Sequence, residues 1–287
     1  MGINEVVVED FRGLKVNVKL KRVNIVLGEN GSGKTSFLES IFIPTLLQSE
    51  LNNNDIRTLL LYTLSARGDV LSAIQTLSDS EVLIDGVTTK FKKIDPYTIN
   101  IEINNIKVAE IKAKPWSPLT LAVLKTNNKY SLPLYISTSF DSSDNPKMIY
   151  DVVKRKIRGE STFDLLLDEH GRLTLYYDKL PVYVIGRGLL KRELIRLALM
   201  SSDILLIDEI ESSLHQDLLT EVLNDIKREQ GSQVIFTTNS NEVMKIIGKT
   251  FNDSEAQIIY LSKAGYKTYN LSEITNFEKP FNWLGYV

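Results

Sequence analysis

The chain has no cysteine and only two histidines, His170 and His215, among its 287 residues. The lack of cysteine excludes disulfides, thiol nucleophiles and cysteine-ligated metal, and so few histidines argue against a dedicated zinc site. No stretch approaches the roughly 20 apolar residues of a membrane-spanning helix, and the amino-terminal segment has no basic-then-apolar signal pattern. We therefore expect a cytoplasmic protein without membrane insertion.

A strong charge of either sign is also missing, since the formal net charge is -2. A hydrophobic content of 43% and a charged content of 24% are ordinary for a globular chain. The charge balance excludes a globally basic nucleic-acid binder, so any contact with DNA or RNA needs a local basic patch.

The best local patch lies in a helix that we expect over residues 145–158. Lys154 and Arg158 would be neighbours at i,i+4 on such a helix and would give it a cationic face for phosphate. The alternative is a solvated helix face, because acidic residues nearby dilute the charge. The basic residues of this patch are Lys147, Lys154, Arg155, Lys156 and Arg158.

A glycine-rich phosphate loop is the clearest feature that the sequence does have. Residues 28–35, GENGSGKT, match G-x-x-x-x-G-K-[ST] at every fixed position. A buried strand over Val23–Leu27 is expected before it, and a helix ending near Pro44 after it. The loop amides and the helix N-terminus favour phosphate, Lys34 would bridge the β- and γ-phosphates, and the Thr35 hydroxyl would ligate Mg²⁺. The expected nucleotide-binding residues are Gly28, Glu29, Asn30, Gly31, Ser32, Gly33, Lys34, Thr35 and Ser36.

An acidic pair follows a second wholly apolar strand, ILLI, at residues 204–207. In phosphate-loop ATPases an Asp at this place helps to hold Mg²⁺, and an adjacent Glu orients the attacking water. Strand ends are also where open parallel sheets bind ligands. The alternative is an ordinary acidic helix start. We assign Asp208 to the metal, and Glu209 to catalysis together with Lys34; the expected cofactors are ATP and Mg²⁺.

These segments resemble the ABC-type ATPase superfamily, in particular the branch of RecF, SMC and OLD proteins. The resemblance lies in FRGLKVNVKLKRVNIVLGENGSGKTSFLESIF near the start of the chain and in ILLIDEIESSLH further on. It implies an α/β phosphate-loop fold with a mostly parallel core sheet flanked by helices, an antiparallel β layer and a small helical insertion. We expect an N-terminal lobe over 1–44, inserted helices and β layer over 45–180, and a C-terminal lobe over 181–287.

The resemblance also implies that two ATPase heads pair face to face around ATP. The signature loop of the second head would fall on Ile185–Leu189, where Gly186 and Gly188 could present N–H groups to a γ-phosphate and Arg187 could add charge. The serine usual in this loop is replaced. The alternative is a glycine-rich loop that only caps a helix.

Other positions depart from the family pattern. Asn239 stands where relatives carry a histidine that contacts the γ-phosphate, so the resemblance assigns Asn239 to catalysis, although asparagine cannot become cationic. We call this place the switch position. Ser137–Ser139 offers no equivalent of the metal-contacting glutamine. Arg12, in the FRG segment, matches a place that approaches the nucleotide, although a surface role is equally open. His215 lies where heads communicate across a dimer.

The sequence thus predicts an ATPase whose ATP-bound heads form a homodimer and act on DNA or RNA, in maintenance or defence, or on a partner that handles nucleic acid. We expect a solo head, since no heptad arm is present and the segment after Ser240 is shorter than the about 50 residues of a small domain. Two alternatives stay open. One is an ATP-sensing interaction module with negligible turnover, and the other is the ATPase subunit of a membrane transporter.

Overall fold

The computed structural model describes residues 2–66, 70–77, 79–113, 120–124, 128–137 and 144–274. The chain folds around a six-stranded core sheet with the strand order β16-β15-β3-β14-β13-β9. Its strands run parallel except β16, which pairs antiparallel with β15 at one edge. The core strands are β3 (Val23–Gly28), β9 (Pro133–Ile136), β13 (Ile204–Ile207), β14 (Gln233–Thr237), β15 (Ala256–Ser262) and β16 (Gly265–Asn270).

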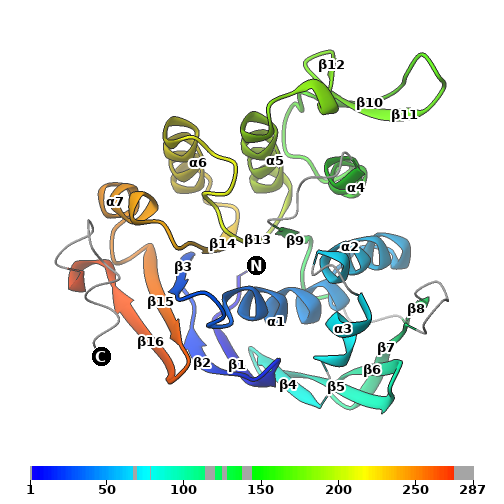
Figure 1. Cartoon of the computed structure of the whole chain (residues 1–287), viewed down its shortest axis with the longest axis vertical. Helices are drawn as coiled ribbons and strands as arrows, with labels where there is room; N and C mark the ends of the chain where they lie inside the picture. Colours follow the sequence, from blue (N-terminus) through cyan, green and yellow to red (C-terminus); the bar gives the residue numbers. More distant parts are fainter. Residues whose placement is uncertain are drawn as a thin grey trace.

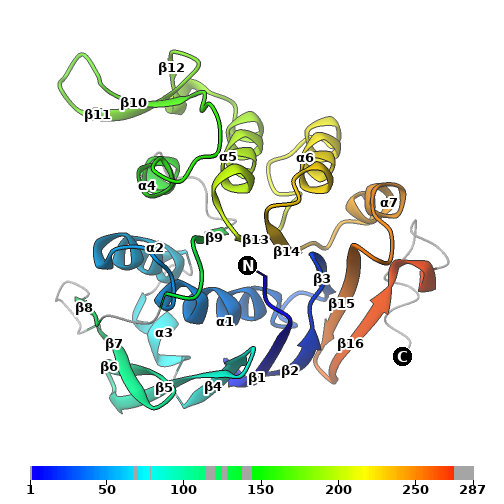
Figure 2. The ribbon, with the colours of Figure 1, turned by 180° about the vertical axis from the view of Figure 1, so that it is seen from behind.

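Helices cover both faces of this core sheet (Figures 1 and 2). Every residue of β3, β9, β13 and β14 is buried, which explains why these strands are mostly apolar on both faces rather than alternating. Helices α5, α6 and α7 lie on one face, and α1 lies on the other. Their bounds are α1 (Lys34–Leu47), α5 (Arg187–Ser201), α6 (Gln216–Arg228) and α7 (Asn241–Thr250).

A second, seven-stranded sheet lies beyond α1, so that this helix is enclosed between two sheets (Figure 1). Its strand order is β2-β1-β4-β5-β6-β7-β8, and every pairing is antiparallel. The antiparallel layer that the sequence predicts is therefore confirmed. The strands are β1 (Glu5–Phe11), β2 (Leu14–Lys19), β4 (Ser80–Ile84), β5 (Val87–Asp95), β6 (Thr98–Ile103), β7 (Ile106–Lys112) and β8 (Thr120–Val123).

The remaining elements form the small helical insertion and a projecting hairpin. Strands β10 to β12 make a three-stranded sheet at the end of the molecule beyond α4 and α5, at the top of Figure 1. The predicted fold class is confirmed by these layers. These elements are α2 (Asn53–Ser65), α3 (Val70–Gln75), α4 (Asp144–Val153), β10 (Phe163–Leu167), β11 (Leu173–Tyr177), β12 (Leu180–Pro181), and the short 3₁₀ turns η1 (Val182–Val184) and η2 (Leu271–Glu273).

Helix α1 does not end near Pro44, as the sequence pattern predicted, but continues to Leu47. Proline removes one helix hydrogen bond and strains the preceding turn. Nearly every residue of α1 is buried between the two sheets, and the Thr45 hydroxyl adds a hydrogen bond to the Ile41 carbonyl at 2.8 Å. Tertiary packing therefore outweighs the local helix-breaking preference.

The basic helix expected over residues 145–158 is also shorter than predicted, because α4 ends at Val153. Arg158 instead donates its backbone N–H to the carbonyl of Met200, at the end of α5, and Gly159 takes a positive φ of 125°. Lys154 and Arg158 are consequently not i,i+4 neighbours on a helix face, and that part of the prediction is wrong.

The core sheet draws strands from each of the three sequence segments, since β9 lies in the middle one. The division at residues 44 and 180 stays a prediction. Within the described ranges, no helix is both long enough and apolar enough to cross a membrane.

Candidate functional site

The phosphate loop occupies the turn between β3 and α1. The Ser32 backbone N–H donates to the Glu29 carbonyl at 3.1 Å, and Gly33 has a left-handed φ of 96° immediately before the helix starts. The Lys34 ammonium folds back over the loop, donating to the carbonyls of Gly28 at 2.8 Å and Glu29 at 2.9 Å. Burial lowers the pKa of Lys34, while the nearby acidic loop after β13 opposes that shift. The arrangement holds a cation at the mouth of an amide-rich turn.

Gly28 is required at its position by the fold itself. Its φ of 153° lies in the region that favours glycine, and a Cβ built on it would lie 2.2 Å from the Leu261 carbonyl oxygen of the neighbouring strand. The same Cβ would lie 2.5 Å from the Ser32 hydroxyl oxygen. Any side chain there would push the loop away from the sheet.

The acidic pair meets the phosphate loop at the carboxyl edge of the core sheet. Strands β13, β14 and β3 are neighbours and parallel, so residues that follow them converge. The Thr35 hydroxyl donates to Asp208 Oδ2 at 2.8 Å, and the Thr237 hydroxyl donates to Asp208 Oδ1 at 2.7 Å. Tyr135, from β9, donates to the same carboxylate at 3.4 Å. The structure thus brings together the two side chains that the sequence assigns to the metal.

Glu209 stands next to Asp208 and is partly accessible to solvent. Its φ of 46° is left-handed, and its backbone N–H donates to the Thr237 hydroxyl at 2.7 Å. Partial burial, followed by repulsion from Asp208 and Glu211, raises the pKa of Glu209. A carboxylate of raised basicity beside a cation is suited to accept a proton or orient water.

Asn239 joins the two halves of the site. Its side-chain amide donates to Asn30 Oδ1 of the phosphate loop at 3.2 Å, and its backbone N–H donates to Glu211 Oε1 at 2.9 Å. A neutral asparagine therefore fills the place between the phosphate loop and the acidic loop.

The predicted signature residues lie at the start of α5. Gly186 is the residue that precedes the helix, and Gly186 and Arg187 are exposed. Gly188 is packed more tightly, since a Cβ there would lie 2.6 Å from the Ser213 carbonyl oxygen, whereas one at Gly186 would meet nothing within 4 Å. Only the second of these two glycines is demanded by packing within the chain.

Arg12 lies beside the phosphate loop but points toward α1. Its guanidinium pairs with Glu39 Oε2 at 3.0 Å and donates to the Thr76 hydroxyl. Arg12 also lines a hollow of about 420 Å³ together with Gly31 and Gly33. Contact with a nucleotide would require the guanidinium to turn away from Glu39, and this assignment stays a prediction.

The remaining predicted positions contribute less to the site. The Ser137 hydroxyl lies 3.0 Å from the Tyr62 hydroxyl, in the buried interior, and residues 138 and 139 lie outside the described residues. His215 precedes α6, is exposed, and lies 3.7 Å from the carboxylate of Asp217.

Two contributors were missed by the sequence analysis. The Thr237 hydroxyl joins Asp208 to Glu209, since it donates to the Asp208 carboxylate and accepts from the Glu209 backbone N–H. Thr237 lies in the run TTNS, residues 237–240, which contains Asn239. Lys191 is buried on α5 and donates to the acidic loop. Its signal in the sequence is its spacing of three and four residues from the buried Leu194 and Ile195, which puts a charge on the apolar face of the helix.

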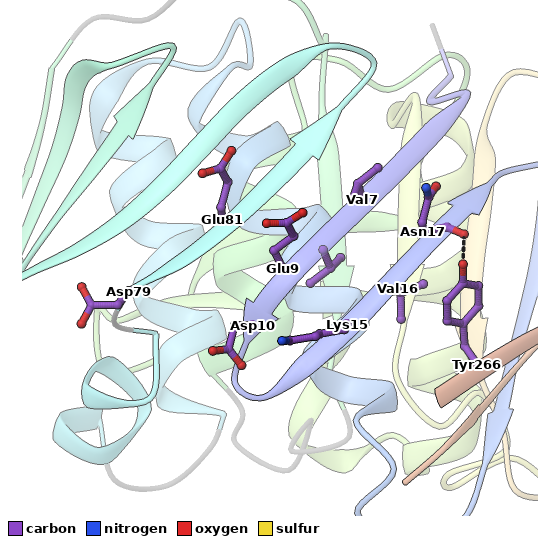
Figure 3. Close-up of a pocket in the computed structure, with 10 residues that line it drawn as sticks. Val7, Glu9, Asp10, Lys15, Val16, Asn17, Asp79, Glu81 and Tyr266 are labelled. Atoms are coloured by element: carbon purple, nitrogen blue, oxygen red, sulfur yellow. Dashed lines mark hydrogen bonds between the residues drawn. The ribbon is translucent and has the colours of Figure 1, made fainter. Parts of the chain in front are cut away.

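A separate hollow of about 670 Å³ lies over β1, β2 and β4 on the antiparallel sheet (Figure 3). Glu9 and Glu81 project into it from directly paired positions on adjacent strands, with Asp10, Asp79 and Lys15 at its rim. Because carboxylates dominate this lining, it would repel a triphosphate. The phosphate loop remains the candidate nucleotide site.

Comparison with known proteins gives one family model and several relatives. The model described as "AAA domain, putative AbiEii toxin, Type IV TA system" matches residues 145–245. That span contains the predicted signature loop, the acidic pair and Asn239.

Among curated proteins, the DNA replication and repair protein RecF of Shewanella baltica (strain OS155 / ATCC BAA-1091) is 31% identical over 116 residues. The match covers 36% of this chain and 32% of that protein. RecF of Shewanella sp. (strain W3-18-1) is 30% identical over the same shares of both chains. The chain thus spans about a third of the length of these curated relatives.

Among solved structures, that of the recombination mediator protein RecF-ATPrS in the RecFOR pathway has a TM-score of 0.50 to this chain. It is 13% identical and covers 93% of this chain and 98% of its own. At that identity the likeness concerns the fold. The predicted resemblance to the RecF branch of ABC-type ATPases is confirmed.

Proposed function

We propose that the chain is a phosphate-loop ATPase of the type that RecF represents, and that it binds ATP with magnesium and hydrolyses it. Its similarity to RecF in fold and over about a third of its sequence supports this proposal. The hydrogen bond of 2.8 Å between Thr35 Oγ1 and Asp208 Oδ2 carries this proposal. It joins the loop that would hold the triphosphate to the carboxylates that would hold metal and water.

The donor set fits magnesium. Mg²⁺ prefers oxygen ligands and is usually held by one or two protein groups, nucleotide phosphates and waters. Thr35 and Asp208 offer a hydroxyl and a carboxylate at one point of the loop. Within the part of the chain that the structure describes, no group of three or more His, Cys, Asp or Glu side chains could hold a metal by itself. When bound, magnesium would neutralise charge on the β- and γ-phosphates.

The chain's own residues would then act as follows. The Lys34 ammonium donates to the carbonyls of Gly28 and Glu29. With a nucleotide bound, it would donate these hydrogen bonds to phosphate oxygens instead. Glu209 would orient the attacking water, because its carboxylate follows Asp208 directly at the edge of the sheet. Asn239 would donate its side-chain amide to the γ-phosphate or to that water, because it already bridges to Asn30 of the loop.

We further propose that ATP joins two copies of the chain. The start of α5 is exposed at Gly186 and Arg187, and a helix N-terminus favours a phosphate group. The segment before it is apolar and exposed, with Tyr183 at 65% and Val184 at 60% of full exposure. Such a surface fits a second copy that supplies the phosphate, as the homodimer model requires.

We propose that ATP hydrolysis by this chain acts on DNA or RNA, or on a partner protein that handles nucleic acid. The RecF relatives are described as DNA replication and repair proteins, and the family model names a toxin system, so maintenance and defence are both supported as settings. The basic patch of residues 147–158 adds little support for nucleic-acid binding, because two of its lysines are already neutralised by carboxylates. Lys154 pairs with Asp151, and Lys156 pairs with Glu50 at 2.8 Å.

A second candidate function, an ATP sensor with negligible turnover, is favoured by Asn239 and Ser137. Asn239 holds a neutral amide at the switch position, and Ser137 is engaged with Tyr62 inside the protein. Binding would then still order the loops, but the attacking water would receive less help.

A comparison of wild type with Glu209→Gln separates these functions. We expect Glu209→Gln to bind Mg-ATP in calorimetry and to lower the rate of phosphate release by about 10²-fold or more, as loss of a general base does. Light scattering of Glu209→Gln with ATP should give the mass of a dimer, and without ATP that of a monomer. Equal background rates for both proteins would instead favour the sensor.

A further inference from the structure

Helix α5 has two buried charged side chains, and they differ in their partners. Glu193, 3% exposed, pairs with Arg192 of the same helix, whereas Lys191, only 1% exposed, reaches the loop after β13. Its ammonium donates to the carbonyl oxygens of Glu209 at 2.8 Å and Ser212 at 2.9 Å. A buried ammonium is costly unless its N–H groups are paired. Both partners here are main-chain groups of the short loop between β13 and α6.

That loop has an unusual backbone. Glu209 has a φ of 46° and Ser213 a φ of 63°, and such left-handed positions in non-glycine residues persist only where surrounding contacts hold them. The peptide N–H of Glu209 is held by Thr237, and the carbonyl of Glu209 by Lys191. Contacts on both sides of its Cα therefore fix the direction in which the Glu209 side chain leaves the loop.

The same helix meets the loop a second time, one turn earlier. A Cβ at Gly188 would lie 2.6 Å from the Ser213 carbonyl oxygen, so backbone and backbone are in close contact there. Helix α5 is thus fastened to the loop at its first turn and again at Lys191. These two contacts connect the start of α5 to the main chain that carries Glu209 (Figure 2 shows α5 beside α6, the helix into which the loop leads).

We infer that Lys191 is a positioning residue for ATP hydrolysis, tying α5 to the backbone of Glu209 so that the Glu209 carboxylate faces the attacking water. The inference rests on the proposed function, in which Glu209 orients that water. Lys191 acts through the main chain of Glu209 and not through contact with the nucleotide. The residues that would receive the phosphate of a second copy, Gly186 to Gly188, lie at the start of the helix that Lys191 anchors.

The test uses the full chain with Lys191→Met, which keeps the length of the side chain and removes its charge and its donors. The matched control is Lys227→Met, the same replacement at an exposed lysine in the last turn of α6. We expect Lys191→Met to lower kcat on the order of 10²-fold, the loss that a misplaced catalytic group causes. KM and the calorimetric Kd for Mg-ATP should stay within about twofold, because only the hydrolytic geometry changes.

The double variant Lys191→Met/Glu209→Gln separates positioning from general damage. If Lys191 acts through Glu209, the double variant should hydrolyse ATP no more slowly than Glu209→Gln alone. Multiplied losses, or a Kd raised in parallel with the fall in kcat, would overturn the inference. Lys191→Gln, which keeps two N–H donors, replaces Lys191→Met if the latter does not fold, and failure of both to fold would assign Lys191 to the fold alone.

The two levels of proposal fail differently. A wild type that hydrolyses ATP no faster than Glu209→Gln would remove the proposed hydrolysis and this inference with it. A wild type that exceeds Glu209→Gln, with Lys191→Met as active as Lys227→Met, would remove this inference alone.

Discussion

The carboxyl edge of the core sheet and the start of helix α5 both carry glycines that are expected to bind phosphate, yet they are built in opposite ways. At the sheet edge, Lys34, Thr35 and Asp208 each contact another part of the same chain. At the start of α5, Gly186 is exposed, and a Cβ there would meet nothing within 4 Å.

This difference separates a preformed site from a surface. The first region is organised within one chain, so it can bind ligand with little rearrangement. The second offers N–H groups and apolar side chains that another molecule can cover. On the proposed function, one chain would bind ATP at the first region and a second copy would complete the site from the second region.

The largest expected effect is on the preformed region. Lys34→Ala should weaken Mg-ATP binding by roughly 30-fold or more, because it removes the ammonium that would pair with the phosphates of the nucleotide. Truncating one member of a buried charge pair costs about 2 kcal/mol or more. Calorimetry with Mg-ATP measures this effect, with Lys227→Ala as the exposed control. Binding of ATP by Lys34→Ala with wild-type affinity would remove the phosphate loop from the proposed function.

The next effect distinguishes the two glycines of the α5 segment. Gly188→Ala should lower the free energy of unfolding by about 1–3 kcal/mol, since its Cβ would overlap the Ser213 carbonyl. Gly186→Ala should change it by less than about 0.5 kcal/mol, the range of exposed substitutions. Urea unfolding of both variants gives the comparison. Equal losses would contradict the difference in packing at these two positions.

A smaller effect is expected on association. Tyr183→Ser in the Glu209→Gln background should weaken the ATP-dependent dimer about tenfold, a loss of somewhat more than 1 kcal/mol that is typical of an interface aromatic. The affinity of the single chain for ATP should not change. Ile106→Ser removes a comparably exposed side chain, 69% against 65%, on the antiparallel sheet and serves as the control. Light scattering would contradict the proposal if both variants associate equally.

The smallest effect concerns nucleic acid. Lys156 is paired with Glu50 at 2.8 Å, so Lys156→Ala should change duplex-DNA affinity by less than about threefold, as expected for a partly exposed charge that a neighbouring carboxylate already neutralises. Glu50→Ala removes the ion pair and leaves the Lys156 ammonium with only the neutral Ser131 hydroxyl, so it should steepen the dependence of log K on log salt by up to about 0.9, the contribution of one phosphate contact. Fluorescence anisotropy at several salt concentrations tests both. Complete loss of binding in Lys156→Ala would show that the ion pair does not neutralise this segment.

Much of the fold could be read from local pattern. The apolar runs Val23–Leu27 and ILLI predict buried parallel strands, and turns at Asp85-Gly86 and Asn104-Asn105 predict the antiparallel hairpins, all of which the structure contains. The helix through Pro44 could not be predicted, because its stability comes from burial between two sheets. The chain leaves α4 after Val153, and Arg158 then pairs its backbone N–H with the distant Met200, a contact that no local pattern contains.

The sequence by itself determined the phosphate loop and the acidic pair, because both chemistries need particular residue types at fixed short spacing. Tertiary structure alone decided that Thr35 touches Asp208, that Arg12 turns toward Glu39, and that the ammonium of Lys191 reaches the main chain of Glu209. These contacts join residues far apart in the chain. Their geometry is set by strand order and helix packing, which no local pattern contains.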